Sequence, residues 1–322
     1  MVVVGCRATD ANPSDLSCGT LSGDLSTPLR SCDRYGPAMA RALGIDIGGT
    51  KLAAAVVSDT GEVVSGRRAP TPGDNAETVY STLLSLIEDV RSGDEVACGV
   101  GCGGPMGPGG EEVSPLNIPA WRDFPLRSRL AESTLLPTFV DNDAKALALG
   151  EGWVGAARES QDFIAMVVST GVGGGIVLGG RLLDGAAGNA GHVGHMIVEP
   201  DGRRCGCGAR GCLEAYASGP SIEAITGRPP EEARPEVVER TGTLVGRAVA
   251  SVANLLDLGL AVVGGGVALG FGEPFFAAAQ AEIERSACLD FSTGTRIMPA
   301  GLGGDGGVVG GARVGFLGVV ER

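Results

Sequence analysis

Aromatic and basic side chains are scarce in this sequence of 322 residues. Phe, Trp and Tyr together make up 4% of the chain, so the core must be built mostly from Val, Leu, Ile and Ala. The 25 Lys and Arg residues are outnumbered by 38 Asp and Glu residues, which gives a net charge of −13 and a pI of about 4.7. Because phosphate backbones are bound by clustered basic side chains and no basic run occurs, the composition argues against DNA or RNA as a partner.

Long hydrophobic runs are also missing. The longest apolar stretch, between Leu258 and Phe271, is interrupted by three consecutive glycines and preceded by Asp257, so no transmembrane helix is expected. The first residues, MVVVGCRATDANPSD, lack the charged and long apolar regions of a signal peptide. We therefore expect a cytoplasmic protein with no membrane partner.

Histidine is rare as well, and the cysteines do not suggest a disulfide framework. The chain has 2 His and 9 Cys, an odd number in a chain too long to need such a framework, so buried thiols or metal ligands are expected. Glycine is in excess at 55 residues, but it has no strict three-residue period, which excludes collagen. A hydrophobic share of 43% and a mean hydropathy of +0.19 indicate that the chain can bury a core.

The segment before residue 41 differs from the rest of the chain. Residues 1–40 are rich in Ser, Asp, Thr, Pro and Gly with little periodicity, which predicts a disordered extension. An alternative is that the protein starts at Met39, just before the first apolar segment.

Short apolar segments alternate with amphipathic ones after residue 40, and this alternation predicts an α/β fold. A strand, a turn rich in Gly and Thr and a second strand occur twice, at residues 44–57 and 163–179. Two similar halves facing each other would form a cleft. Strands are expected at 42–47, 52–58, 62–68, 96–100, 139–141, 163–168, 176–178 and 261–266, and helices at 78–91, 144–150, 221–227, 236–256 and 307–320.

One glycine motif is rejected. The sequence GVGCGG at residues 99–104 matches the dinucleotide-binding pattern GxGxxG, but Pro105 follows and no helix begins there. With so many glycines in the chain, one such match carries little weight. The Walker A pattern is absent.

The segment Asp46-Ile47-Gly48-Gly49-Thr50-Lys51 is more specific, because it places a carboxylate at a strand end before two glycines, a hydroxyl and a cation. Backbone N–H groups at Gly48 and Gly49 can approach phosphate oxygens, Thr50 or Lys51 can contact a phosphate, and Asp46 can hold Mg²⁺ through water. A plain hairpin turn explains this segment equally well by itself.

A second loop of the same chemistry favours phosphate binding. It runs through Ser169, Thr170, Gly171 and Gly173 to Gly175, and we expect the whole of 169–175 to form a turn. Backbone contacts with a nucleotide base or ribose are expected at a third group of glycines. These are Gly264, Gly265 and Gly266.

Seven segments together resemble the ROK family of sugar kinases, repressors and open reading frames, within the actin-like ATPase superfamily. They are GIDIGGTKLAAAVV, NIPAW, VDNDAKALALGE, VVSTGVGGGIVLGG, GHVGH, CGCGARGCLEAYASG and VVGGGVALG, in family order and at family spacing across residues 41–322. The resemblance implies two actin-like, ribonuclease H-like α/β domains around a central cleft. These would be a smaller domain at 41–150, on which the C-terminal helix 306–322 packs, and a larger one at 151–305 that carries a zinc-binding loop. A homodimer is also implied.

Asn142 and Asp143 lie between the strand expected at 139–141 and the helix at 144–150. A carboxylate in that place can face the cleft and accept the proton of a sugar hydroxyl, although Asp and Asn are also common helix N-caps. The resemblance implies that Asp143 is the general base and that Asn142 binds a sugar hydroxyl. Lys145 departs from the usual family sequence NDAN, and we expect it to alter a local contact only.

The pattern C-x-C-x4-C at Cys205, Cys207 and Cys212, with His195 ten residues upstream, supplies four ligands of the type that closes a tetrahedral zinc site. Three unrelated thiols are the alternative. With no open coordination position, zinc would organise the sugar site, and the second ring nitrogen of His195 would be free for a sugar hydroxyl.

The resemblance implies further sugar ligands at Glu214, Asn117 and Gly103, although Glu214 would also suit an ordinary helix start. His192, in Gly191-His192-Val193-Gly194-His195, replaces the Glu that many family glucokinases carry, and the G-H-x-G-H form is similar to bacterial N-acylmannosamine kinases of the family. A His ring is bulkier and offers fewer acceptors than a carboxylate.

We therefore expect an ATP-dependent sugar kinase that acts on a hexose, with N-acetylmannosamine as the leading alternative substrate and polyphosphate as an alternative donor. A sugar-responsive regulator without kinase activity is the rival interpretation. Family repressors carry a winged-helix domain of about 80 residues before the first phosphate loop, whereas 45 residues precede Asp46 here and show no helical periodicity.

Overall fold

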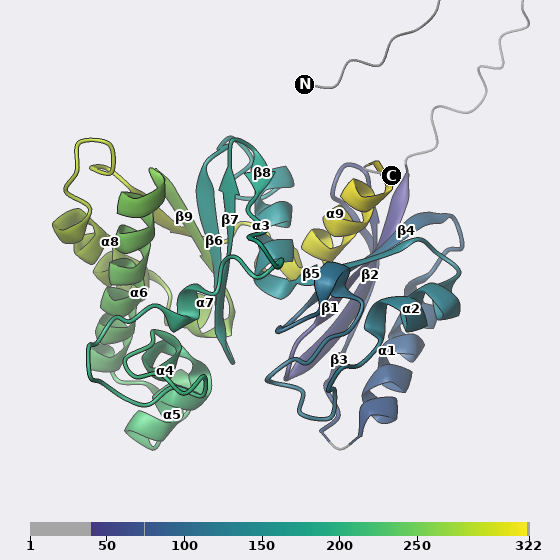
Figure 1. The fold of residues 1–322 in the computed structure, drawn as a ribbon, viewed down its shortest axis with the longest axis horizontal. Helices are drawn as coiled ribbons and strands as arrows, with labels where there is room; N and C mark the ends of the chain where they lie inside the picture. Colours follow the sequence, from purple (N-terminus) through teal and green to yellow (C-terminus); the bar gives the residue numbers. More distant parts are fainter. Residues whose placement is uncertain (1–39, 74, 321–322) are drawn as a thin grey trace, which may run out of the picture. The chain divides into compact units, whose positions relative to one another are not determined.

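The computed structural model describes residues 40–73 and 75–320, and the extension expected at 1–40 lies outside this range except for Ala40. A five-stranded sheet opens the described chain in the order β3-β2-β1-β4-β5 (Figure 1). Strands β1 to β3 form an antiparallel meander, and β4 and β5 run parallel to β1. Their bounds are Arg41–Ile47, Lys51–Ser58, Val63–Pro70, Glu95–Cys102 and Thr138–Asn142.

A second five-stranded sheet repeats this plan in the order β10-β9-β6-β7-β8. Again three antiparallel strands come first, and the next two run parallel to the first of them. The repeat of strand, Gly-rich turn and strand found in the sequence is therefore a repeat of topology as well. The bounds are Phe163–Val168 for β6, Val172–Leu178 for β7, Arg181–Leu182 for β8, Leu260–Gly264 for β9 and Arg296–Pro299 for β10.

Helices cover both faces of the first sheet. Because side chains alternate along a strand, Leu43 and Ile45 face one way and Ala42 the other. Helix α1 (Ala76–Val90), capped by Asn75, places its apolar stripe in the first cluster together with α2 (Leu126–Thr134). The opposite face is covered by α9 (Gly306–Val320), which packs on β1, β2, β4 and β5.

Helix α3 (Asp143–Trp153) contacts both sheets and α9. Glycines allow these close approaches: a Cβ at Gly150 would lie 3.0 Å from the backbone nitrogen of Gly310, and a Cβ at Gly101 on β4 would lie 3.0 Å from the Cβ of Ala146. Any larger side chain would push the helices apart. The first residue of α3 directly follows β5, so the strand fixes where the helix begins.

The second sheet is covered by the remaining helices. Residues of α6 and α8 form a large core with β6, β7 and β9, while Leu147 and Ala148 of α3 pack on the other face with Phe163 and Val262. The bounds are Glu214–Ala217 for α4, Gly219–Thr226 for α5, Pro235–Leu256 for α6, Gly266–Phe271 for α7 and Glu273–Ser286 for α8.

The expected strands and helices are all present, with ends shifted by a few residues, but α2, α4, α7, α8 and the edge strands β8 and β10 were not predicted. The turn expected at 169–175 is wrong in its extent. Strand β7 begins at Val172, and Gly173, Gly174 and Gly175 pair with β6. Glycine is needed there because a Cβ at Gly175 would lie 2.7 Å from the carbonyl oxygen of Ala144, on the closely packed α3.

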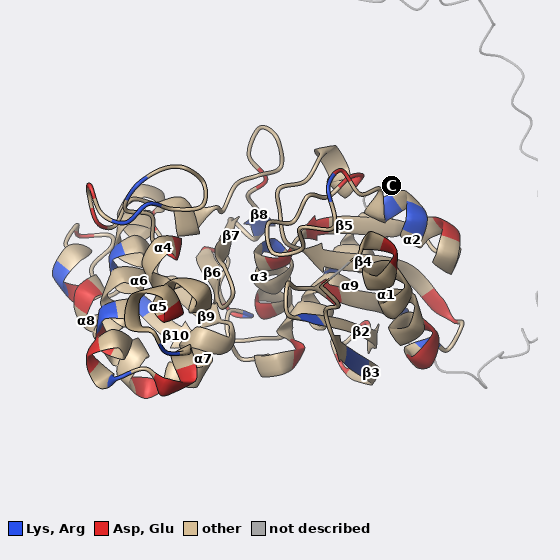
Figure 2. Ribbon diagram, turned by 90° about the horizontal axis from the view of Figure 1, so that it is seen from below, with Lys and Arg blue, Asp and Glu red and all other residues tan. Residues whose placement is uncertain are grey.

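Charges of both signs are distributed over the described helices. Figure 2 shows Lys and Arg interspersed with Asp and Glu on elements such as α6 and α8. No helix of the described residues is both long and apolar enough to span a membrane.

Candidate active site

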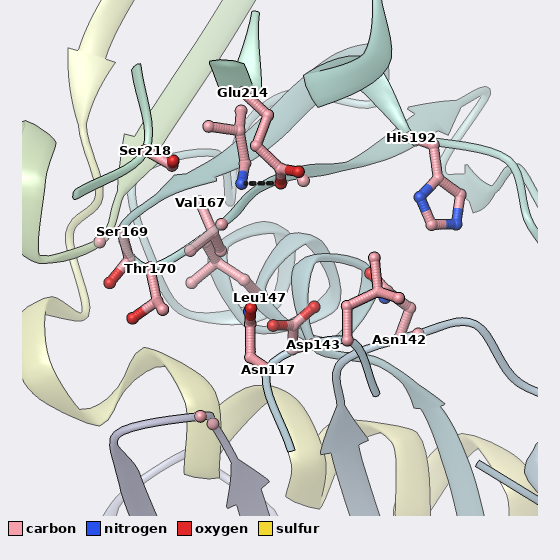
Figure 3. A pocket seen from close by; sticks show the side chains of 18 of the residues that line it. Asn117, Asn142, Asp143, Leu147, Val167, Ser169, Thr170, His192, Glu214 and Ser218 are labelled. Atoms are coloured by element: carbon pink, nitrogen blue, oxygen red, sulfur yellow. Dashed lines mark hydrogen bonds between the residues drawn. The ribbon is translucent and has the colours of Figure 1, made fainter. Parts of the chain in front are cut away.

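A cavity of about 950 Å³ is lined by loops that leave both sheets, and Figure 3 shows part of its wall. This volume is large enough for two substrates of moderate size. Of the residues proposed from the sequence, all but Gly103 and Cys212 line it. The lining set contains Asp46, Gly48, Gly49, Thr50, Lys51, Asn117, Asn142, Asp143, Ser169, Thr170, Gly171, Gly173, His192, His195, Cys205, Cys207, Glu214, Gly264, Gly265 and Gly266.

The first phosphate loop is the hairpin between β1 and β2. The hairpin turn expected as the alternative is therefore present, and the same residues line the pocket. The backbone N–H of Gly48 donates to the carbonyl of Lys51 at 2.9 Å. Lys51 Nζ lies 3.7 Å from Asp46 Oδ2, and burial raises the pKa of Asp46 although Lys51 opposes the shift. A Cβ at Gly49 would lie 2.5 Å from the Cβ of Asn117, so the hairpin tip is packed against that residue.

The second phosphate loop connects β6 to β7. A Cβ at Gly171 would lie 3.2 Å from Glu214 Oε2 and 3.4 Å from Asn117 Nδ2, so glycine keeps open the space between these polar groups. Glu214 Oε2 accepts a hydrogen bond from the backbone N–H of Val172 at 2.9 Å, which is the dashed line in Figure 3. The group expected to bind sugar is therefore joined directly to the loop expected to bind phosphate.

The third glycine group lies between β9 and α7. Gly265 has φ +97°, and a Cβ there would lie 2.7 Å from the carbonyl carbon of Val168. Only glycine fits this conformation without strain. The backbone thus bends into the cavity next to the second phosphate loop.

Asp143 is the first residue of α3, and Asn142 is the N-cap. Asn142 Oδ1 and Asp143 Oδ1 both accept from the backbone N–H of Ala144, at 3.1 and 2.8 Å. Asn142 therefore caps the helix, which was one of the alternatives expected from the sequence. Asp143 accepts a hydrogen bond at the helix start too, but its carboxylate also lines the cavity. Figure 3 shows its carboxylate and that of Glu214 entering the pocket from different elements.

Burial, together with the negative charge of Asp46, raises the pKa of Asp143 to about 6. Two hydrogen bonds from backbone N–H groups act in the opposite direction but are weaker. A carboxylate with a pKa near neutrality exists in its basic form at pH 7 and holds a proton more strongly than an ordinary Asp, which suits a general base.

His195, Cys205, Cys207 and Cys212 form one cluster, in which all four ligand atoms lie within 4.8 Å of one another. Cys205 Sγ is 3.7 Å from His195 Nδ1, and Cys207 Sγ is 3.7 Å from Cys212 Sγ. Four ligands at zinc distances on a tetrahedron are separated by about 3.5–3.8 Å, so the residues fit such an ion.

The loop that carries the cysteines is closed by backbone hydrogen bonds. The N–H of Cys205 donates to the carbonyl of Ala209 at 2.8 Å, and Gly208 and Gly211 adopt left-handed conformations with φ of +95° and +79°. Cys205 and Cys207 line the cavity while Cys212 lies behind them, buried next to α4. A metal here would therefore stiffen the pocket wall.

His192 lies at the same end of the cavity, with its ring 6.0 Å from that of His195. Burial lowers the pKa of His192, and the charge of His195 adds to the effect. A neutral imidazole can donate one hydrogen bond and accept another.

Several lining residues were not found from the sequence. Gly104 lines the cavity in place of its neighbour Gly103. Ser218, Leu269 and Gly307 also contribute, and a Cβ at Gly307 would overlap the carboxylate of Asp46. The one signal for Gly307 is its place in a Gly-Gly pair at the start of the last helix.

Comparison with known proteins identifies the family. The model of the ROK family matches residues 42–314. This chain belongs to the ROK family. Two curated relatives of this ROK protein differ in the activity that they are named for. It is 37% identical to an N-acetylmannosamine kinase of Haemophilus influenzae (strain PittGG), over 72% of this chain and 82% of that protein. It is 33% identical to a glucokinase of Halalkalibacterium halodurans, over 84% of this chain and 93% of that protein.

Solved structures confirm the fold. A ROK family glucokinase from Streptomyces griseus in complex with glucose and AMPPNP is 30% identical to this ROK protein, with a TM-score of 0.77 over 86% of this chain and all of that one. A ROK family transcriptional regulator has a TM-score of 0.71 over 85% of this chain and 77% of that one. At 24% identity it shows the fold alone. The predicted α/β fold with two actin-like sheets is therefore correct.

Proposed function

We propose that this ROK family carbohydrate kinase transfers the terminal phosphoryl group of ATP to a hydroxyl of a hexose, with Asp143 as the general base. The observation that carries the proposal is the carboxylate of Asp143, whose pKa is about 6, in one cavity with two phosphate-type glycine loops. The relatives that are named kinases support the reaction class.

In the proposed mechanism, Asp143 accepts the proton of the attacking hydroxyl while the oxygen of that hydroxyl forms its bond to phosphorus, and ADP leaves with the bonding electron pair. Asn117, Asn142 and Glu214 would hold the sugar through their polar groups at the same end of the cavity. Gly48, Gly49 and Gly171 line the cavity and would bring backbone N–H groups to the phosphates, and a Cβ at Gly49 or Gly171 would collide with or crowd Asn117 at this wall. Asp46 would hold Mg²⁺ through water, and this ion would supply positive charge to the transferred phosphoryl group.

We also propose a structural zinc ion on His195, Cys205, Cys207 and Cys212. The proposal rests on the mutual spacing of the four ligand atoms and on the closed donor set, which leaves no position for a catalytic water. The ion would fix the wall formed by Cys205, Cys207 and His195.

Two sugar classes remain candidates. The glucose-bound structural relative favours a simple hexose, with transfer to the 6-hydroxyl. His192 and the identity to N-acetylmannosamine kinases favour an N-acyl hexosamine. The net charge of −13 gives no support to the regulator without kinase activity. The homodimer and the cytoplasmic location that we expected stay predictions.

The decisive experiment is an ADP-release assay with a panel of hexoses and N-acyl hexosamines, with ATP and polyphosphate compared as donors by detection of the sugar phosphate. Asp143→Asn is run beside the wild type and should lose nearly all turnover. Near-normal turnover of that variant would contradict the role of Asp143. No phosphorylation of any sugar by the wild type, together with specific operator binding, would contradict the kinase proposal.

A further inference from the structure

Lys145 is a buried cation two residues beyond Asp143 on α3. Its side chain is 1% exposed. Its ammonium group donates to Asp184 Oδ1 at 2.8 Å and to the carbonyl of Gly188 at 2.9 Å, and it lies 3.6 Å from Asp141 Oδ1. The ammonium group thus makes two hydrogen bonds and one longer ion pair. Two of its partners lie 39 and 43 residues away in the sequence, so the contacts of Lys145 join α3 to a distant segment of the chain.

The residue type at this position is itself informative. The chain contains two lysines, Lys51 and Lys145, and its other Lys or Arg positions are all arginine. Arginine presents a planar fork of five donors, whereas lysine is a compact charge with three. A buried site with two hydrogen-bond acceptors and a carboxylate at ion-pair distance suits the compact ammonium group better than the planar fork of arginine.

Two partners of Lys145, Asp184 and Gly188, belong to the segment that joins β8 to the first histidine of the GHVGH motif. In this segment, residues 184–189 are exposed, and Gly185 and Gly188 adopt left-handed conformations. Within the described part of the chain, Lys145 is the one side chain from outside residues 184–190 that hydrogen-bonds to them. The C-terminal end of the segment is held by the backbone N–H of Gly174, which donates to the carbonyl of Gly191 at 2.9 Å, and Lys145 is the side-chain anchor of the exposed part before it.

The same loop forms part of the pocket wall. Residues 188–192 line the same cavity as Asn142 and Asp143, which belong to the same strand–helix junction as Asp141 and Lys145. Asp141 also accepts from the backbone N–H of Asn142 at 2.7 Å. One connected set of contacts thus runs from the proposed sugar ligand through Asp141 and Lys145 to the loop.

We propose that Lys145 is a positioning residue that fixes the loop 184–192 against the N-terminal turn of α3 and thereby sets the sugar end of the pocket. This inference rests on the proposed kinase function. Asp184 is the loop residue whose carboxylate binds Lys145. Because its side chain is 71% exposed, it can be replaced without disturbing the core.

The test uses the full-length variants Lys145→Met, Asp184→Asn and the double variant, with Arg181→Met as the control. Arg181 is an exposed cation on β8 at the base of the same loop, outside the pocket wall. In Lys145→Met the KM for the sugar should rise about tenfold or more while the KM for ATP changes less than about twofold. Asp184→Asn should shift the sugar KM in the same direction, and the double variant should be no worse than Lys145→Met because both changes break one contact.

Hydrogen exchange of the sugar-free protein supplies a readout that does not depend on activity. Amides of residues 184–191 should exchange faster in Lys145→Met and Asp184→Asn, and the control should match the wild type. Unchanged exchange in this loop, an equal rise of both KM values, or additive effects in the double variant would overturn the proposal. If Lys145→Met does not fold, Asp184→Asn alone decides. If the wild type phosphorylates no sugar but the two variants still exchange faster than the wild type in this loop, the kinase function is contradicted. The role of Lys145 in fixing the loop is then still supported.

Discussion

Replacement of Asp143 by Asn should stabilise the protein while it abolishes catalysis. The pKa of Asp143 is about 6 in the folded chain against an ordinary value of 3.8, because burial and Asp46 disfavour its charged form. Between these two pH values the folded chain keeps a proton that the unfolded chain has lost. Stability therefore falls as the pH rises through this window, and the cost is fully present above pH 6.

The magnitude follows from the size of the shift. Each pKa unit corresponds to about 1.4 kcal/mol, so the ionised Asp143 costs about 3 kcal/mol of folding free energy at pH 7.5 and almost nothing at pH 3.8. Asn is isosteric, keeps an Oδ1 acceptor for the N–H of Ala144 and carries no charge. The variant should therefore melt about 5 °C above the wild type at pH 7.5, given the unfolding entropy of a chain of this length.

Thermal unfolding of both proteins from pH 4 to pH 8 measures this difference. The gap in Tm should be close to zero at pH 4, grow through pH 5 and be constant above pH 6.5. Asp89→Asn, an exposed carboxylate on α1, is the control and should show no such growth. In parallel, kcat/KM of the wild type should rise with pH through a midpoint near 6. A Tm gap that is the same at pH 4 and pH 8, or an activity independent of pH between 5 and 7, would refute the reasoning.

Three further predictions concern other parts of the site. Gly171→Val should abolish activity, since the side chain would crowd Glu214 and Asn117 in the pocket wall; a kcat/KM within about threefold of the wild type would contradict the need for glycine at this position. Cys207→Ser should lower bound zinc, measured by metal analysis, from about one ion per chain to well below that and should reduce Tm, and full occupancy in the variant would argue against this ligand. Glu151→Ala should destabilise the fold by about 3 kcal/mol or more in urea unfolding, because the fully buried carboxylate accepts from the backbone N–H groups of Ala156, Gly301 and Leu302; a loss below about 1 kcal/mol would contradict it.

The sequence was sufficient to predict the paired sheets and the polar and glycine-rich parts of the pocket wall, because the relevant signals are local. Apolar strands end in Gly-rich loops, and Asp143 follows a strand directly, so short segments carry the information. Helix α8 was missed because its buried side includes Ala279 and Glu282, which weaken the apolar periodicity.

Some contacts between distant segments could not be predicted from local patterns. The glycines of β7 resembled a turn until the close approach of α3 explained them. Two partners of Lys145 lie on another loop, and nothing near position 145 in the sequence points to Asp184.

The position of α9 links the first sheet to the end of the chain. Strands β1 to β5 are complete at residue 142, but one apolar face of their sheet, which includes Ala53, Ala55 and Val57, is covered by a helix that begins at Gly306. During synthesis this face stays bare while the entire second sheet is made. The first sheet therefore cannot reach its final packing until the ribosome has released the last helix, so a chain that stops before residue 306 would leave an apolar surface open to aggregation.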